Sequence, residues 1–145
     1  MARKKLTSAN STCYLTVDGL FSSPVKIEGY STDSALEMDD YNPAEVRMGV
    51  DGYLSGGWRP TPKVIKISLE ANSPSVEIFE TWLNQMETDR EVSTCDMVFW
   101  IPSISRKYTG TCGYLTTGKN MSSAKQMLEA LTFTITFEKW EGVPA

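Results

Sequence analysis

Residues that could carry chemistry are few and scattered in this 145-residue chain. The chain has no histidine, which excludes Ser-His, Cys-His and histidine-metal arrangements. Asp39, Asp40 and Asp51 remain as acid-base candidates, but turn formation or surface charge explains each of them. Gly56-Gly57 lacks the lysine motif of a phosphate loop and is predicted to be a turn between two strands. We therefore expect a protein that is not an enzyme, with no cofactor and no metal.

The three cysteines, Cys13, Cys95 and Cys112, show no C-x-x-C spacing and are odd in number. A turn at Ser103-Ile104 would place Cys95 opposite Cys112, and Phe99 opposite Tyr108, in an antiparallel pair. Cys95 and Cys112 are then either buried thiols or a cross-strand disulfide, and a bridge between chains is a third alternative. Assembly in the cytoplasm favours thiols.

Composition predicts one soluble domain over residues 1–145, because 41% of the residues are hydrophobic and 22% are charged. The net charge of −4 argues against tight nucleic-acid binding. Residues 1–11 are predicted to be a flexible N-terminal arm that carries the one basic cluster. No apolar run is long enough to span a membrane, so we expect neither membrane insertion nor a cleaved signal.

Period-two alternation predicts a mainly β protein. The clearest strand is 131–137, where Leu and Phe alternate with Thr. Further strands are predicted over 13–17 and 25–27 as a hairpin, over 45–50 and 65–70 as half-buried strands, and over 95–101 and 107–115 as an antiparallel pair. One helix is predicted over 74–90, because Val76, Phe79, Trp82 and Leu83 form an apolar stripe behind Ser73 and Pro74. A short helical turn is predicted before the last strand, over 124–131.

Residues 31–44 form a long irregular segment, which is uncommon in a compact domain unless it has a function. Two interpretations are open. Its apolar side chains are either buried in a neighbouring chain or folded back over the chain's own sheet. The residues predicted to make contacts between subunits are Leu36, Met38, Asp39, Asp40 and Tyr41.

The segment VDGYLSGGWRPTPKVIKISLEANSPS (50–75), with the helix that carries Phe79 and Trp82, resembles the tail tube proteins of contractile-tailed bacteriophages. WIPSISRKYTGTCGYLTTG (100–118) and LTFTITFEKW (131–140) are similar to later strands of that family. The resemblance implies an antiparallel β-barrel or sandwich with one flanking helix, as in the Hcp tubes of type VI secretion. It also implies hexameric rings that stack into a tube, with the 31–44 loop between rings.

The resemblance further implies that the tube lies in the virion tail after assembly in the host cytoplasm. Its implied partners are copies of itself, the contractile sheath protein, a tape-measure protein in the lumen, and baseplate and tail terminator proteins. DNA would pass through without specific binding along a lumen lined by acidic or small polar residues, with threonine-rich strand faces as candidates.

Three alternatives stay open. A tube from a pyocin or a secretion device would keep the fold and carry no genome. A monomeric β-barrel that binds a small apolar ligand would use the long loop as a lid. A hydrolase that relies on carboxylates is the third.

Overall fold

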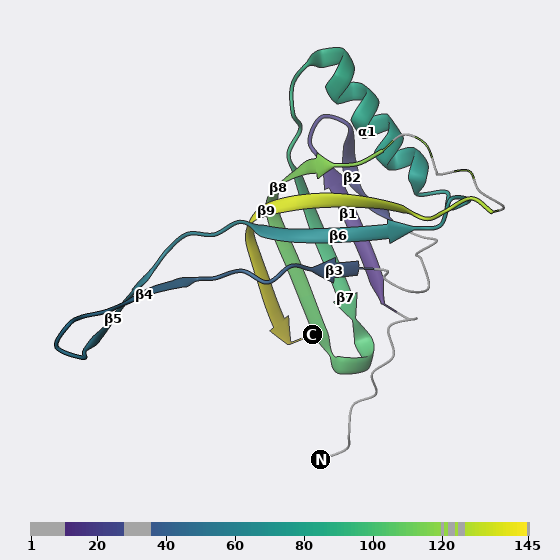
Figure 1. The fold of residues 1–145 in the computed structure, drawn as a ribbon. Helices are drawn as coiled ribbons and strands as arrows, with labels where there is room; N and C mark the ends of the chain where they lie inside the picture. The colour runs from purple at the N-terminus through teal and green to yellow at the C-terminus, as the bar shows by residue number, and fades with distance from the viewer. Residues whose placement is uncertain (1–10, 28–35, 120, 122–123, 125–126, 145) are drawn as a thin grey trace.

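The computed structural model describes residues 11–27, 36–119, 121, 124 and 127–144 (Figure 1). Two predicted segments therefore lie partly outside the described residues. They are the N-terminal segment, at residues 1–10, and the long loop, at residues 31–35. The elements in chain order are β1 Thr12–Val17, β2 Phe21–Lys26, β3 Leu36–Met38, β4 Ala44–Met48, β5 Leu54–Trp58, β6 Lys63–Leu69, α1 Val76–Asp89, β7 Cys95–Ile101, the 3-10 turn η1 Pro102–Ile104, β8 Arg106–Thr117 and β9 Leu131–Pro144.

The main sheet is antiparallel and has seven strands in the order β2-β1-β7-β8-β9-β6-β3. It bends sharply, so that β6, β3 and the first half of β9 cross in front of β1, β7 and β8 (Figure 1). The two end strands, β2 and β3, do not pair with each other. The fold is therefore the predicted mainly β sandwich-like architecture with one helix, and its sheet does not close into a barrel.

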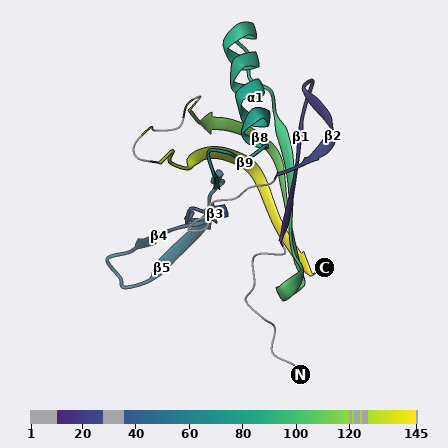
Figure 2. The ribbon, with the colours of Figure 1, turned by 90° about the vertical axis from the view of Figure 1, so that its right-hand side faces the viewer.

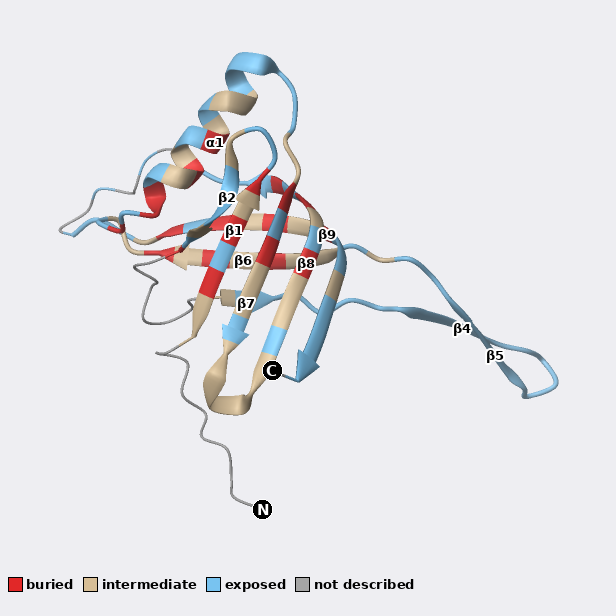
Figure 3. Ribbon diagram, turned by 180° about the vertical axis from the view of Figure 1, so that it is seen from behind, coloured by how far each residue is buried: buried red, intermediate tan, exposed pale blue. Residues whose placement is uncertain are grey.

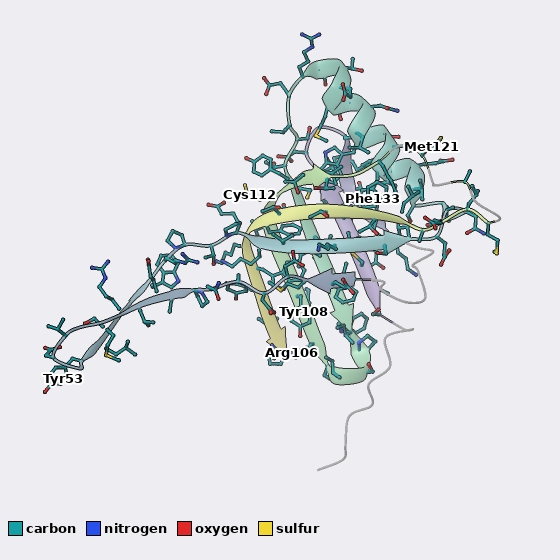
Figure 4. The ribbon with its side chains drawn as sticks, viewed as in Figure 1. Tyr53, Arg106, Tyr108, Cys112, Met121 and Phe133 are labelled. Carbon is teal, nitrogen blue, oxygen red and sulfur yellow. The ribbon has the colours of Figure 1, made fainter. Side chains whose placement is uncertain are left out.

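The bend lies where β8 and β9 pass from one layer to the other, near Cys112 (Figure 4). Cys112 is an extra residue in β8, because Cys95 pairs with Gly113 while Met97 pairs with Gly110. It has a positive φ of 54°, and a bulge with this conformation increases the local twist. At Gly113 a Cβ atom would lie 2.5 Å from the Phe137 ring. The corner thus requires both a bulge and a glycine.

The core lies between the two layers and under α1 (Figure 3). Phe79 stacks on Phe133 with ring centroids 4.3 Å apart, and Trp82 is fully buried beside Phe79. The helix follows the predicted apolar stripe, but it covers Val76–Asp89 and not 74–90. The prediction of Ser73 as its cap is wrong, because Ser75 is the N-cap residue and the hydroxyl of Ser73 accepts a hydrogen bond from the backbone N–H of Ser75.

Several sequence-based predictions need correction. Gly56 and Gly57 lie inside β5 and not in a turn. Leu36 to Met38 form strand β3, and Ala44 begins β4, so this part of 31–44 is not an irregular loop. Ala124 and Leu128 form an isolated β-bridge where a helical turn was predicted. The strands predicted at 13–17, 65–70, 95–101, 107–115 and 131–137 are confirmed as parts of β1, β6, β7, β8 and β9.

Candidate functional site

The most unusual feature is the hairpin of β4 and β5, which projects from the body of the protein (Figures 1 and 2). We call residues 42–59 the arm. Its two strands pair only with each other, as a separate two-stranded sheet. Both strands are exposed along their whole length. An isolated two-stranded hairpin is only marginally stable in water, so the arm needs something else to pack against.

The register makes the arm amphipathic. Residues that pair directly across an antiparallel ladder lie on the same face. One face therefore carries three apolar pairs, Ala44 with Trp58, Val46 with Gly56 and Met48 with Leu54. The other face carries Glu45 with Gly57 and Arg47 with Ser55. Such a pattern belongs to a sheet with one face buried, yet none of the described residues covers this face.

The apolar side chains of the arm are among the most exposed in the described part of the chain. Trp58 is 76% exposed, Met48 63%, and Val46 and Leu54 60% each. Tyr53, at the end of the hairpin, is 75% exposed (Figure 4). The prediction that the Val46 strand is half-buried is wrong for the isolated chain. Contiguous apolar patches of several hundred Å² mark interaction sites on soluble proteins.

Backbone hydrogen bonds hold the arm in shape at both ends. At the base, Arg59 donates its backbone N–H to the carbonyl of Pro43 at 2.9 Å and its Nε to that of Asn42 at 3.0 Å. At the turn, Gly49 donates to the carbonyl of Tyr53 at 2.9 Å, and Gly52 has a φ of +87°. The arm is therefore an ordered hairpin.

The five predicted contact residues lie in β3 and in the segment that leads from it to the arm. Leu36 packs against the chain's own core, as in the alternative that folds this segment over its own sheet. Asp39 forms an ion pair with Lys66 at 3.4 Å. Tyr41 lies under the ammonium group of Lys63, 5.2 Å from the ring centroid. Met38 and Asp40 are exposed. Their predicted role between subunits stays a prediction.

The predicted contact residues precede the arm in the chain, and the projecting arm was not predicted from the sequence. The signal was present, because apolar residues alternate at 44, 46 and 48 and again at 54, 56 and 58. A period of two predicts that one face is buried, but it does not say whether the covering surface comes from the same chain.

The cysteines do not pair as predicted. Cys95 lies opposite Gly113, while Cys112 sits in the bulge and donates its backbone N–H to the carboxylate of Asp96 at 3.2 Å. Both Cys95 and Cys112 are free thiols. Burial, with a smaller contribution from the Asp96 charge, raises the pKa of Cys95 to about 12. Desolvation and then Glu138 raise the pKa of the Cys112 thiol. The predicted pairing of Phe99 with Tyr108 is confirmed.

Among the described residues, no cluster of three or more Cys, Asp or Glu side chains is placed to hold a metal ion. In the same part of the chain, no helix has the length and apolar character needed to cross a bilayer.

The fold is that of chains found in contractile injection assemblies. A chain of the sheath/tube terminator of an extracellular contractile injection system (PVC) superposes with a TM-score of 0.65 at 10% identity, over 99% of each chain. A chain of the anti-feeding prophage tube-terminating cap gives 0.60 at 10% identity, over 100% of this chain and 95% of that one. A chain of the six-fold symmetrised anti-feeding prophage baseplate gives 0.59 at 12% identity, over 99% and 98%.

These likenesses confirm the predicted resemblance to contractile tail tube proteins at the level of the fold. The sequence itself matches the model of the family described as tail fiber protein gp32 over residues 4–141. The chain therefore belongs to that family. No curated protein sequence matches it.

Proposed function

We propose that this chain is a structural, non-catalytic subunit of the inner tube of a contractile bacteriophage tail. Six copies form a ring and rings stack into a tube inside the sheath. The observation that carries the proposal is the ordered arm with an exposed apolar face. A protein that keeps this face in water as a monomer would be prone to aggregation, whereas a protein that buries it against a further copy gains an assembly contact.

Similarity of fold supports the proposal. The relatives belong to tube, cap and baseplate structures, and the baseplate that contains one of them has six-fold symmetry. The main sheet does not close on itself, and copies that join around a ring would cover unpaired strand edges.

A hydroxyl-rich strand face is our candidate for the tube lining. Thr132, Thr134 and Thr136 alternate with the buried residues of β9. The hydroxyl of Thr132 lies 3.1 Å from that of Ser68, and the hydroxyls of Thr136 and Thr116 lie 3.4 Å apart. Lys66 lies opposite Thr134 on this face, and the Asp39 carboxylate 3.4 Å away offsets its charge. A face with a single paired lysine would let DNA slide, since it offers no array of Lys or Arg that would release counterions and retain the phosphates.

The proposed partners follow from this role. They are the sheath protein around the tube, the tape-measure protein in the lumen, the baseplate and tail terminator proteins at the ends, and DNA only in transit. The proposed location is the virion tail, after assembly in the host cytoplasm. A pyocin-like or secretion device fits the fold equally well, and capsid genes beside the coding sequence would separate the two.

Two observations favour related positions in the tail. Likeness to cap and terminator chains favours a subunit that ends the tube, and the family's description favours a tail fibre. Size-exclusion chromatography and negative-stain microscopy of the purified chain test all three roles. Stacked hollow rings support a tube subunit, single rings support an end subunit, and solid filaments support a fibre. A monomer at every concentration, above all with a bound apolar ligand, would overturn the proposal.

A further inference from the structure

The second half of β9 has an open backbone edge. Residues 131–137 of β9 pair with β6 on one side, and the last of these pairs is Lys63 with Phe137. Residues 138–144 continue to pair with β8, as far as Arg106 with Pro144. Within the described part of the chain, these seven residues have no strand on their other side. They present alternating N–H and C=O groups to any strand that approaches.

The other edges of the main sheet are less suited to accept a strand. Strand β3 has only three residues. At the end of β2, Ile27 donates its N–H to the carbonyl of Cys13, so this N–H points toward β1. Val25 pairs with Leu15 of β1. Because every second N–H of a strand points to the same side, the N–H of Val25 also points toward β1. Pro24 then occupies an outward position, where it offers no donor. Proline at such a position blunts an edge.

An apolar groove lies beside the open edge of β9. It measures about 260 Å³ and is lined by Leu36, Glu37, Met38, Ile65, Phe99, Tyr108 and Trp140. Trp140 belongs both to the edge and to the groove, and its ring stacks on that of Tyr108 at a centroid distance of 6.2 Å. The guanidinium of Arg106 lies over the Tyr108 ring, 5.8 Å from its centroid; Figure 4 labels both residues. Edge and groove therefore form one continuous surface, which we call the acceptor.

We propose that the acceptor binds the arm of a second copy by strand addition. A strand of the arm pairs with residues 138–144, its apolar face covers the groove, and its polar face with Glu45 and Arg47 stays in water. This inference rests on the proposed function, for which it names the binding surface. The occupant is a second copy because the arm projects away from the acceptor of its own chain in both views (Figures 1 and 2).

The surface areas favour an arm that binds both edge and groove. The apolar side chains on this face of the arm present about 500 Å², taking roughly 100 Å² for each of the five side chains of Ala44, Val46, Met48, Leu54 and Trp58. A stable interface needs about 800 Å² on each partner. The apolar face alone falls short of this area. Pairing along the β9 edge adds backbone contacts and the buried area of a further strand, which brings the contact into the required range.

Cysteine cross-linking tests the acceptor in the full-length chain, in a Cys112→Ser background that leaves Cys13 and Cys95 buried. Ser55→Cys places a thiol on the polar face of the arm. A second thiol is placed on β9, by Lys139→Cys in one variant and by Glu141→Cys in another. These two positions lie two residues apart, so the pair of variants tests two registers of the docked strand. The matched control is Ser22→Cys on the exposed edge of β2. Arm and edge variants are mixed under assembly conditions, oxidised mildly and run on a non-reducing gel.

We expect the arm and β9 pair to give about tenfold more disulfide-linked dimer than the arm and β2 pair, because docking raises the local thiol concentration. Equal yields with both edges, or a dominant arm-to-arm dimer in the Ser55→Cys chain alone, would overturn the acceptor while leaving the proposed assembly intact. Absence of any assembly of the unsubstituted chain by microscopy would instead remove the proposed function on which the inference rests.

Discussion

Replacing Trp58 by alanine should separate assembly from folding. The Trp58 side chain is 76% exposed in the isolated chain, so that roughly 150 Å² of a side chain of about 200 Å² becomes buried when the arm docks. Truncation to Ala removes most of this area. At ~25 cal/mol for each Å², the loss is about 3 kcal/mol per contact, which raises the critical concentration for assembly about 100-fold.

Folding should be nearly unaffected, because Trp58 contributes nothing to the buried core. The thermal midpoint of Trp58→Ala should stay within ~2 °C of that of the parent chain, as for other exposed substitutions. The assay is sedimentation of assembled protein over a concentration series, with thermal unfolding followed by circular dichroism.

Glu45→Ala is the matched control, since it lies on the opposite, polar face of the same hairpin. Its effect on the critical concentration should be no more than a few-fold, as expected for an exposed charge. Unchanged assembly of Trp58→Ala would refute the reasoning, and so would equal losses in the two variants or a large drop in the thermal midpoint of Trp58→Ala.

Three further predictions concern the corner of the sheet and its thiols. Gly113→Ala should destabilise the fold by about 2–3 kcal/mol through overpacking, because the new Cβ would lie 2.5 Å from the Phe137 ring. Urea unfolding measures this loss of stability. Gly57→Ala is the control and should cost far less, because the space around Gly57 is open. Cys112→Gly should stabilise the chain by about 1 kcal/mol, since glycine adopts the positive φ of 54° without strain, and an unchanged thermal midpoint would contradict this. The pKa of Cys95 rises from 9.0 to about 12 on folding. Between these pH values the unfolded chain loses the thiol proton first, so stability should fall with rising pH, by at most ~1.4 kcal/mol per unit. Urea unfolding over this pH range should show the fall for the parent chain and a smaller one for Cys95→Ala.

Local patterns predicted the elements that bury their own side chains. The alternation of Leu131, Phe133, Ile135 and Phe137 predicts a strand with one buried face, and the Phe79 and Trp82 stripe predicts a helix with one buried face. In the structure the same chain covers both faces. In both cases the period of the apolar residues matches the geometry of the element. This is why the core and most strand positions could be predicted.

The features that the sequence did not predict depend on longer-range geometry. The extra residue at Cys112 shifts the register by one, and no local signal marks a non-glycine residue with positive φ. The pairing of Cys95 with Gly113 follows from that shift. The exposure of Val46 and Trp58 depends on where the hairpin points, and it projects from the body of the protein (Figure 1). Local alternation of apolar residues does not determine that direction.

The proposed contact joins two different surfaces, the arm on one copy and the acceptor on β9 of another. In an open series of such heterologous contacts, one end copy keeps an unused arm and the other end copy keeps an unused acceptor, until the series closes into a ring. A two-fold dimer would satisfy it only if two copies exchanged arms reciprocally, whereas a ring requires each arm to reach a different copy from the one whose arm is accepted. The proposed ring is of the second kind. Association should therefore proceed from monomer to rings or stacked rings without a stable dimer. Analytical ultracentrifugation that finds a dimer as the end state would contradict this directional contact, even if the arm proved essential for the dimer.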